Sequence, residues 1–176
     1  MNEKLYKNIS LSEINVFIDM DGVLAEYKRG PVEQYLQPGF FLDLKPDREA
    51  IELAQSLLNM GLRVFSFTTL LLGGSNDPRK EKGQWLLKNM PQLYPPLTVP
   101  IGIGKHELLK ELFEIKENPP ILIDDFHVNL KGWEDAGGVA IRYLNGINNP
   151  DSPNWKGMQV SNERDLLPIF RKLCII

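Results

Sequence analysis

Short apolar runs alternate along this chain with longer segments whose apolar positions recur at helical spacing. Three runs lead directly into polar residues at their ends: 14–18 (INVFI), 63–67 (RVFSF) and 121–123 (ILI). Two weaker runs lie at 97–101 (LTVPI) and 138–143 (GVAIRY). This alternation is typical of a parallel sheet covered by helices. We therefore predict an α/β, Rossmann-like fold with a parallel sheet of about five strands flanked by helices.

The segments between these strands predict the helices. Asp47 to Met60 places apolar residues on one face and ends before Gly61, a residue that favours helix termination. Asp77 and Pro78 have the residue types of an N-cap and a first helical position. The expected helices are therefore 47–60, 77–89, 105–116 and a closing helix at 165–173, and the Asn-, Gly- and Pro-rich segment 144–155 is expected to be a loop.

The first predicted strand and its helix are unusually far apart. About two dozen residues, from Gly22 to Pro46, separate them, far more than a usual strand-to-helix connection contains. We predict one domain over residues 1–176, with residues 23–44 forming a small cap insertion within it.

Composition and charge narrow the possible partners. The chain has 176 residues with 43% hydrophobic and 24% charged residues, which are ordinary values for one globular domain. Its formal net charge is -3 and no segment concentrates Lys or Arg, so we expect no binding to duplex nucleic acid. No apolar run approaches the ~20 residues of a membrane helix, so we expect a soluble protein without a membrane association. With one cysteine, Cys174, and no signal-peptide pattern, we expect a cytoplasmic location.

Two carboxylates follow the first strand. Asp19 and Asp21 would lie where parallel sheets place their ligands, and Gly22 lets the chain turn away. One aspartate can attack phosphorus while the other protonates the leaving oxygen and then activates water. The alternative is a pair of strand-end caps.

A second acid pair, Asp124 and Asp125, follows the ILI strand. Adjacent buried acids are costly unless a cation or hydrogen-bond donors neutralise them. Together with Asp19 and Asp21 they would suit Mg²⁺, a hard cation that binds one or two carboxylates and a substrate phosphate. An Asp-Asp pair alone is more often a helix cap or a turn.

A hydroxyl pair and a lysine complete the set. Thr68 and Thr69 end the RVFSF strand and could hold a phosphoryl oxygen, and Lys105 could neutralise both nucleophile and phosphate. Each type is common, so the prediction depends on the whole set.

The order of these residues resembles the haloacid dehalogenase superfamily of phosphotransferases. FIDMDGVLAE resembles its first motif, and the resemblance implies that Asp19 is the nucleophile and Asp21 the acid/base. Thr68 matches the second motif, Lys105 the third, and ILIDD the fourth. The resemblance implies a Mg²⁺ held by the Asp19 side chain, the Asp21 backbone carbonyl and Asp125, with Asp124 acting through water or exchanging roles with Asp125.

A narrower resemblance is to the 5'(3')-deoxyribonucleotidase family and its bacterial relatives. It is carried by DMDGVLA, GFFLDLKP, VFSFTT, EKGQW and LIDD. It implies that Thr69, where the family has Ser, contacts phosphate and that Lys82 reaches it as well. Phe40 and Phe41 match an aromatic pair that could stack on a base, although packing is the commoner role. The cap is much shorter than in the animal enzymes, so base selectivity is not implied.

We therefore expect a magnesium-dependent phosphomonoesterase that acts through an aspartyl-phosphate, with (deoxy)nucleoside 5'-monophosphates as substrates by resemblance. A small-molecule phosphomonoester is the expected partner, and a homodimer is possible. Sugar phosphates or 3'-phosphate ends are alternative substrates, and a catalytically silent phosphate-binding protein is an alternative function. A signalling receiver domain uses similar residues, but in another chain order, which disfavours it.

Overall fold

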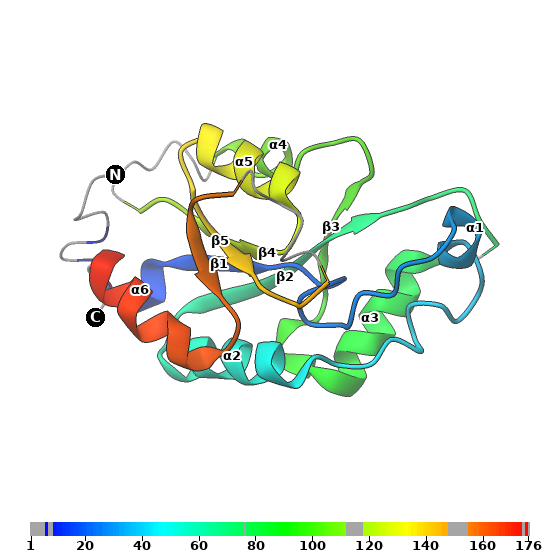
Figure 1. Ribbon diagram of the computed structural model, residues 1–176, viewed down its shortest axis with the longest axis horizontal. Helices are drawn as coiled ribbons and strands as arrows, with labels where there is room; N and C mark the ends of the chain where they lie inside the picture. The colour runs from blue at the N-terminus through cyan, green and yellow to red at the C-terminus, as the bar shows by residue number, and fades with distance from the viewer. Residues whose placement is uncertain are drawn as a thin grey trace.

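The computed structural model describes residues 6, 9–75, 77–111, 118–147, 155–173 and 175. Six parallel strands form a central sheet in the order β3-β2-β1-β4-β5-β6 (Figure 1). The two central strands, β1 and β4, are almost fully buried, as expected for a sheet covered on both faces. The strands are β1 Asn15–Ile18, β2 Arg63–Leu70, β3 Leu97–Pro100, β4 Ile121–Asp124, β5 Val139–Tyr143 and β6 Met158–Val160.

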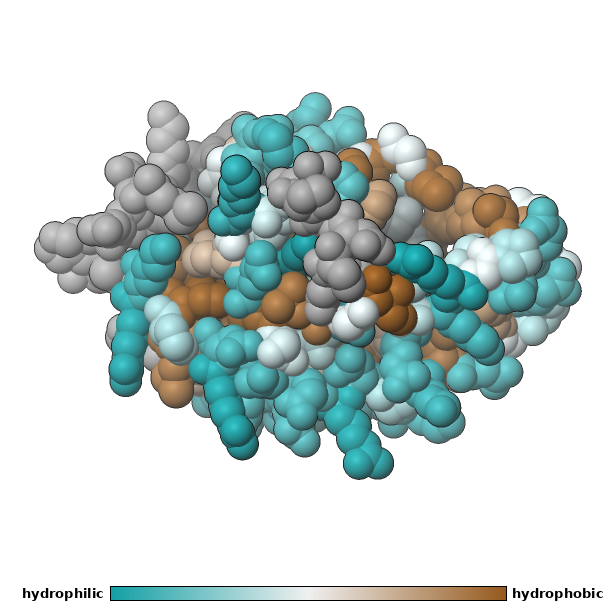
Figure 2. All heavy atoms as spheres, in the orientation of Figure 1, coloured by the Kyte–Doolittle hydropathy of each residue, from teal (hydrophilic) through white to brown (hydrophobic). Residues whose placement is uncertain are grey.

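Helices cover both faces of the sheet. α2 (Arg48–Asn59), α3 (Pro78–Asn89) and α6 (Leu166–Leu173) lie on one face, and α4 (Lys105–Leu108) and α5 (His127–Asp135) lie on the other (Figure 1). The outward surface of the first layer, along the lower edge of Figure 2, is largely hydrophilic. Among the described residues, no helix has the length and apolarity needed to span a membrane.

Each face of the sheet has its own hydrophobic core. The larger core contains Leu53 and Leu57 of α2, Trp85 of α3 and Phe170 of α6. The smaller core contains Phe17, Phe67, Leu130 and Trp133, whose aromatic rings pack edge to face. Phe17 also stacks on the Phe65 ring.

The strand order reverses direction at β1. From β1 the chain runs outward to β2 and β3, then crosses to the other side of β1 and runs outward through β4, β5 and β6. In open parallel sheets, ligands bind at the carboxyl ends of the strands that flank such a reversal. Asp19 and Asp21 follow β1, and Asp124 and Asp125 lie at the end of β4, so both acid pairs flank this point.

The structure confirms the predicted α/β class and all five predicted strands, and it adds a sixth. Strand β6, with the sequence MQV, was not predicted because it is short and includes a polar residue. Helix α5 was not predicted because only Leu130 and Trp133 of its residues are buried. Helix α4 ends at Leu108, earlier than the predicted 105–116, of which residues 112–117 lie outside the described part. The described residues of the predicted loop 144–155 are neither helix nor strand, and residues 148–154 are not described.

The segment between β1 and α2 leaves the sheet after β1 and returns beside its own starting point. Its two ends are tied together, since the Glu26 amide donates to the Lys45 carbonyl at 2.8 Å and the Asp47 amide to the Leu24 carbonyl at 2.9 Å. Between these ties the chain forms the short helix α1 (Val32–Tyr35), and the Leu36 carbonyl at its end accepts from the Ser75 hydroxyl (Figure 1). The 23–44 boundaries and the single-domain assignment remain predictions.

Candidate active site

A tight turn after β1 brings both carboxylates of the first acid pair to the edge of the sheet. The Ala25 amide donates to the Met20 carbonyl and the Gly22 amide to the Ala25 carbonyl, both at 2.8 Å. Gly22 has φ +88°, a conformation that side-chain-bearing residues rarely adopt. Asp19 is buried and Asp21 is partly exposed.

Lys105 connects the two acid pairs. It is the first residue of α4, and its Nζ donates to Asp19 Oδ1 at 2.6 Å and to Asp124 Oδ2 at 2.7 Å. Burial lowers the pKa of Lys105, but the carboxylates of Asp124 and Asp19 outweigh this effect and raise it to about 12. The ammonium group therefore stays charged and holds Asp19 in place.

Asp124 is fully engaged by the protein. Its Oδ1 accepts from the Phe126 amide at 2.8 Å, and its Oδ2 accepts from Asn129 Nδ2 at 3.0 Å as well as from Lys105. Burial raises the pKa of Asp124 to about 6, although Lys105 opposes the shift. Asp124 therefore fixes Lys105 and the start of α5.

Asp125 lies against the turn after β1. Asn145 Nδ2 donates to Asp125 Oδ2 and to the Gly22 carbonyl, each at 2.9 Å, so it ties the loop after β5 to Asp125 and to the turn after β1. A Cβ on Gly22 would overlap the Asp125 carboxylate. Only glycine allows this close approach.

These acids form a group suited to a hard cation. Asp19, Asp124 and Asp125 each offer an oxygen, and these oxygens lie within 4.8 Å of one another. With Asp21 the site has four carboxylates, and the two lysines that contact them, Lys105 and Lys82, bring two positive charges. A divalent cation would offset the negative charge that the lysines leave, and oxygen ligands are those that Mg²⁺ prefers.

Lys82 of α3 organises the other side of the site. Its Nζ forms an ion pair with Asp21 Oδ2, donates to Thr68 Oγ1 at 2.8 Å and donates to the Thr69 carbonyl at 2.7 Å. The Phe41 ring lies against the same ammonium group, 4.6 Å from Nζ to the ring centroid. Burial raises the pKa of Asp21, and the charge of Lys82 opposes this. Asp21 Oδ1 is buried without a partner among the described residues.

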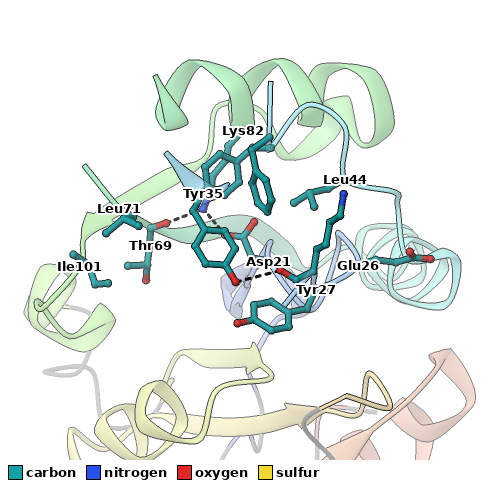
Figure 3. Close-up of a pocket in the computed structure, with 12 residues that line it drawn as sticks. Asp21, Glu26, Tyr27, Tyr35, Leu44, Thr69, Leu71, Lys82 and Ile101 are labelled. Carbon is teal, nitrogen blue, oxygen red and sulfur yellow. Dashed lines mark hydrogen bonds and ion pairs between the residues drawn. The ribbon is translucent and has the colours of Figure 1, made fainter. Parts of the chain in front are cut away.

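A cavity of about 200 Å³ opens beside Asp21 under the cap. Figure 3 shows Lys82, Asp21 and Thr69 meeting in it, with Tyr27 and Tyr35 beside them. A hydrogen bond with Tyr35 raises the pKa of Tyr27 to about 12, so this phenol is neutral near pH 7. The remaining lining is mostly apolar: Phe40, Phe41, Leu44, Leu71 and Ile101, with Glu26 and Lys28.

A second cavity, of about 600 Å³, lies over the acids themselves. Asp21, Tyr27, Thr69 and Ile101 line both cavities, so the two are adjacent. Further lining residues are Asp19, Asp125, Asn129, Arg29, residues 102–104, Phe126 and Val128. The arrangement can hold an anionic group over the acids and a flat or apolar group under the cap.

The structure brings together every site residue that the sequence predicted, while their chemical roles remain predictions. Thr69 lines both cavities, whereas the Thr68 hydroxyl is buried and faces Lys82 and Asp21, 3.5 Å from Asp21 Oδ2. Phe40 is half-buried and Phe41 buried, and both line the cavity under the cap.

Sequence reasoning missed several polar groups. Asn129 and Asn145 follow strands β4 and β5, so the rule that ligand-binding residues follow strand ends could have found them. Tyr27 and Tyr35 gave no such signal, because their positions depend on how residues 23–44 fold back.

Comparisons with known proteins agree with this architecture. No protein-family model and no curated protein matches the chain. The crystal structure of D,D-heptose 1,7-bisphosphate phosphatase from Burkholderia thailandensis is similar, with 16% identity and a TM-score of 0.60 over 89% of this chain and 97% of that one. A likeness of this kind shows the fold alone, and it confirms the predicted α/β, Rossmann-like fold with a parallel sheet flanked by helices. It does not show the narrower deoxyribonucleotidase family.

Proposed function

We propose that this protein is a magnesium-dependent phosphomonoesterase that acts through an aspartyl-phosphate on Asp19. The observation that carries the proposal is the acid and lysine cluster at the reversal of strand order, in which Lys105 holds Asp19 and Asp124. A buried carboxylate held by a charged lysine at the floor of an open cavity is suited to attack a bound phosphate. The solved structure that is similar in fold is named as a phosphatase, which supports the proposal.

The residues present fit a magnesium ion. The side chains of Asp19 and Asp125 and the backbone carbonyl of Asp21 would hold it, and Asp124, whose oxygens are engaged by Lys105, Asn129 and the Phe126 amide, would act through water. When bound, Mg²⁺ supplies positive charge that offsets the charge of the phosphoryl oxygens.

The chemistry of the protein residues has two steps. In the first, an Asp19 carboxylate oxygen bonds to phosphorus, the bond from phosphorus to the leaving oxygen breaks, and Asp21 gives its proton to that oxygen. In the second, Asp21 takes a proton from water, the water oxygen bonds to phosphorus, and the bond from phosphorus to Asp19 breaks. Burial raises the pKa of Asp21, which favours the protonated form that the first step needs.

The phosphate would be held by groups on two sides of Asp19. Lys105 and Lys82 would supply positive charge, and Thr69, which lines both cavities, would donate through its hydroxyl. The Thr68 hydroxyl accepts from Lys82 Nζ and donates to Asp21 Oδ2, and it thereby orients both side chains. Such preorganised groups stabilise charge that develops in the transition state.

Nucleoside 5'-monophosphates are the substrates that the cavity under the cap favours. Its lining by Tyr27, Tyr35, Phe40 and Phe41 offers aromatic surface to a flat base, next to the acid Asp21 that would protonate the leaving oxygen. Sugar phosphates are the second candidate, because the structural neighbour acts on a sugar bisphosphate by name.

The test is phosphate release from nucleoside 5'- and 3'-monophosphates and sugar phosphates, with Mg²⁺ and with chelator. Wild type is compared with Asp19→Asn and with Asp135→Asn, a surface acid on α5 that serves as the matched control. We expect Mg²⁺-dependent release by wild type and by the control, and none by Asp19→Asn. Release by Asp19→Asn at the wild-type rate would refute the mechanism, and the preferred substrate decides between the two substrate classes.

A further inference from the structure

Helix α3 presents two adjacent charged side chains to two different parts of the molecule. Lys82 reaches the acids and threonines of the site, as described above. Glu81 is also buried, at 7% exposed, and its two oxygens accept backbone amides of the cap: Oε1 from Gly39 at 2.8 Å and Oε2 from Phe41 at 3.2 Å. One turn of one helix therefore contacts both the site and the cap.

These two bonds hold the returning end of the cap. A buried carboxylate is costly unless donors satisfy it, and hydrogen bonds from backbone amides to a charged acceptor are stronger than neutral ones. One turn later on the same helix, Trp85 Nε1 donates to the Leu44 carbonyl at 2.7 Å. Residues 39–44 are thus fixed to α3 at three points.

The position of this segment shapes the cavity beside Asp21. Phe40, Phe41 and Leu44 line that cavity, and the Phe41 ring contacts the Lys82 ammonium group. Displacement of the Phe41 amide would therefore move an aromatic wall of the cavity, whereas Lys82 stays held by Asp21, Thr68 and the Thr69 carbonyl.

We propose that Glu81 is a positioning residue that determines which leaving groups the enzyme accepts. It acts through the cap backbone and touches neither phosphate nor acids. The inference rests on the proposed phosphomonoesterase function and deepens it: substrates whose leaving group fills the cavity under the cap depend on Glu81, and substrates with a minimal leaving group do not.

The test compares Glu81→Gln with wild type on a nucleoside 5'-monophosphate and on acetyl phosphate, which lacks a bulky leaving group. Glutamine keeps one acceptor oxygen and loses the charge and the second acceptor. We expect KM for the nucleotide to rise about tenfold, the effect of losing one charge-assisted hydrogen bond, with kcat/KM for acetyl phosphate within about twofold of wild type. Glu52→Gln, an exposed glutamate on α2, is the matched control and should change neither value.

An equal loss on both substrates, or no loss on either, would overturn the proposal. Glu81→Asp, which keeps the charge on a shorter side chain, gives the same readout if Glu81→Gln does not fold. Hydrogen exchange of the Gly39 and Phe41 amides tests the positioning without any substrate. If wild type hydrolyses neither substrate, the proposed function fails. Faster hydrogen exchange of these amides in the Glu81 variant would still support the role of Glu81 in holding the cap, and unchanged exchange would refute that role.

Discussion

Asp124 and Asp125 are neighbours with the same functional group, yet their surroundings differ. Both oxygens of Asp124 are engaged within the protein, by Lys105, Asn129 and the Phe126 amide. Asp125 instead lines the open cavity and lies against the Gly22 turn. The sequence left their roles exchangeable, because adjacency in the chain does not show which carboxylate faces the ligand. The geometry favours Asp125 as the metal ligand.

Gly22 is predicted to be essential for the metal site. Gly22→Ala adds a Cβ that overlaps the Asp125 carboxylate, in addition to the cost of a positive φ. Gly61→Ala is the matched control, since Gly61 has φ +86° and nothing within 4 Å of its would-be Cβ. We expect Gly61→Ala to lose about 1 kcal/mol of unfolding free energy and to keep its Mg²⁺ affinity, and Gly22→Ala to lose more stability and most of that affinity. Denaturant unfolding and calorimetric Mg²⁺ titration measure both; equal Mg²⁺ affinity in the two variants would contradict the geometry.

Asp21 is predicted to act as an acid whose importance depends on the leaving group. Asp21→Asn should lower kcat for an alkyl phosphate by about 10²- to 10⁴-fold. For an aryl phosphate, whose leaving oxygen needs no proton, the same substitution should lower the rate of the first step by much less. Because burial raises the pKa of Asp21 and the protonated form is the active one, wild-type kcat/KM for the alkyl phosphate should fall as pH rises through that pKa. Pre-steady-state kinetics over a pH series measure both effects. A loss that is the same for both leaving groups would argue against proton donation.

At the scale of elements, hydrophobic periodicity and capping residues predicted those strands and helix ends that depend on short stretches of sequence. The strands β1, β2 and β4, the N-caps Asp47 and Asp77, and the helix ends near Gly61 and Asn89 follow from short stretches of sequence. Strand β6, helix α5 and the fold of the cap depend on contacts between distant segments. The Glu81 bonds to residues 40 and 42 positions away are the clearest case, since no local pattern marks them.

The N-cap of α2 is predicted to contribute more stability than that of α3. Asp47 Oδ1 accepts from the Ala50 amide at 3.0 Å and from the Tyr143 hydroxyl at 2.8 Å, whereas Asp77 accepts from the Lys80 amide at 3.1 Å. Asp47→Ala removes the cap and leaves the buried phenol of β5 without its acceptor, so we expect a loss of about 2–3 kcal/mol, against about 1 kcal/mol for Asp77→Ala. Denaturant unfolding of both variants, with Tyr143→Phe to separate the second bond, measures this. Equal losses would show that the bond to β5 contributes nothing.

At the scale of the whole molecule, the fold gathers charges that would repel one another. Four carboxylates from the ends of β1 and β4 converge, and two lysines from helices on opposite faces of the sheet reach them. Strand ends in a parallel sheet share one edge, and this rule predicted the four carboxylates. Lys82 lies within α3, and only the family resemblance implied it. The sequence could not predict how these residues pair, because Lys82 and Lys105 approach from separate helical layers.

Mg²⁺ is predicted to stabilise the folded protein. A cation that binds the folded state and not the unfolded chain raises the unfolding temperature as its concentration rises. Asp125→Asn should reduce this increase, whereas the surface variant Asp135→Asn should keep it. Thermal unfolding with increasing Mg²⁺, and after chelation, measures the effect. The same increase in Asp125→Asn and wild type would place the cation elsewhere.

The most direct test of the account is to locate the phosphoryl group on the protein. Asp21→Asn, which should slow the second step, is incubated with Mg²⁺ and an aryl phosphate, quenched in acid and mapped by peptide mass spectrometry. We predict a phosphoryl group on Asp19, and none when Asp19→Asn is added to the variant. A modification on another residue, or turnover of the substrate by wild type with no modified aspartate in either protein, would contradict the Asp19 mechanism.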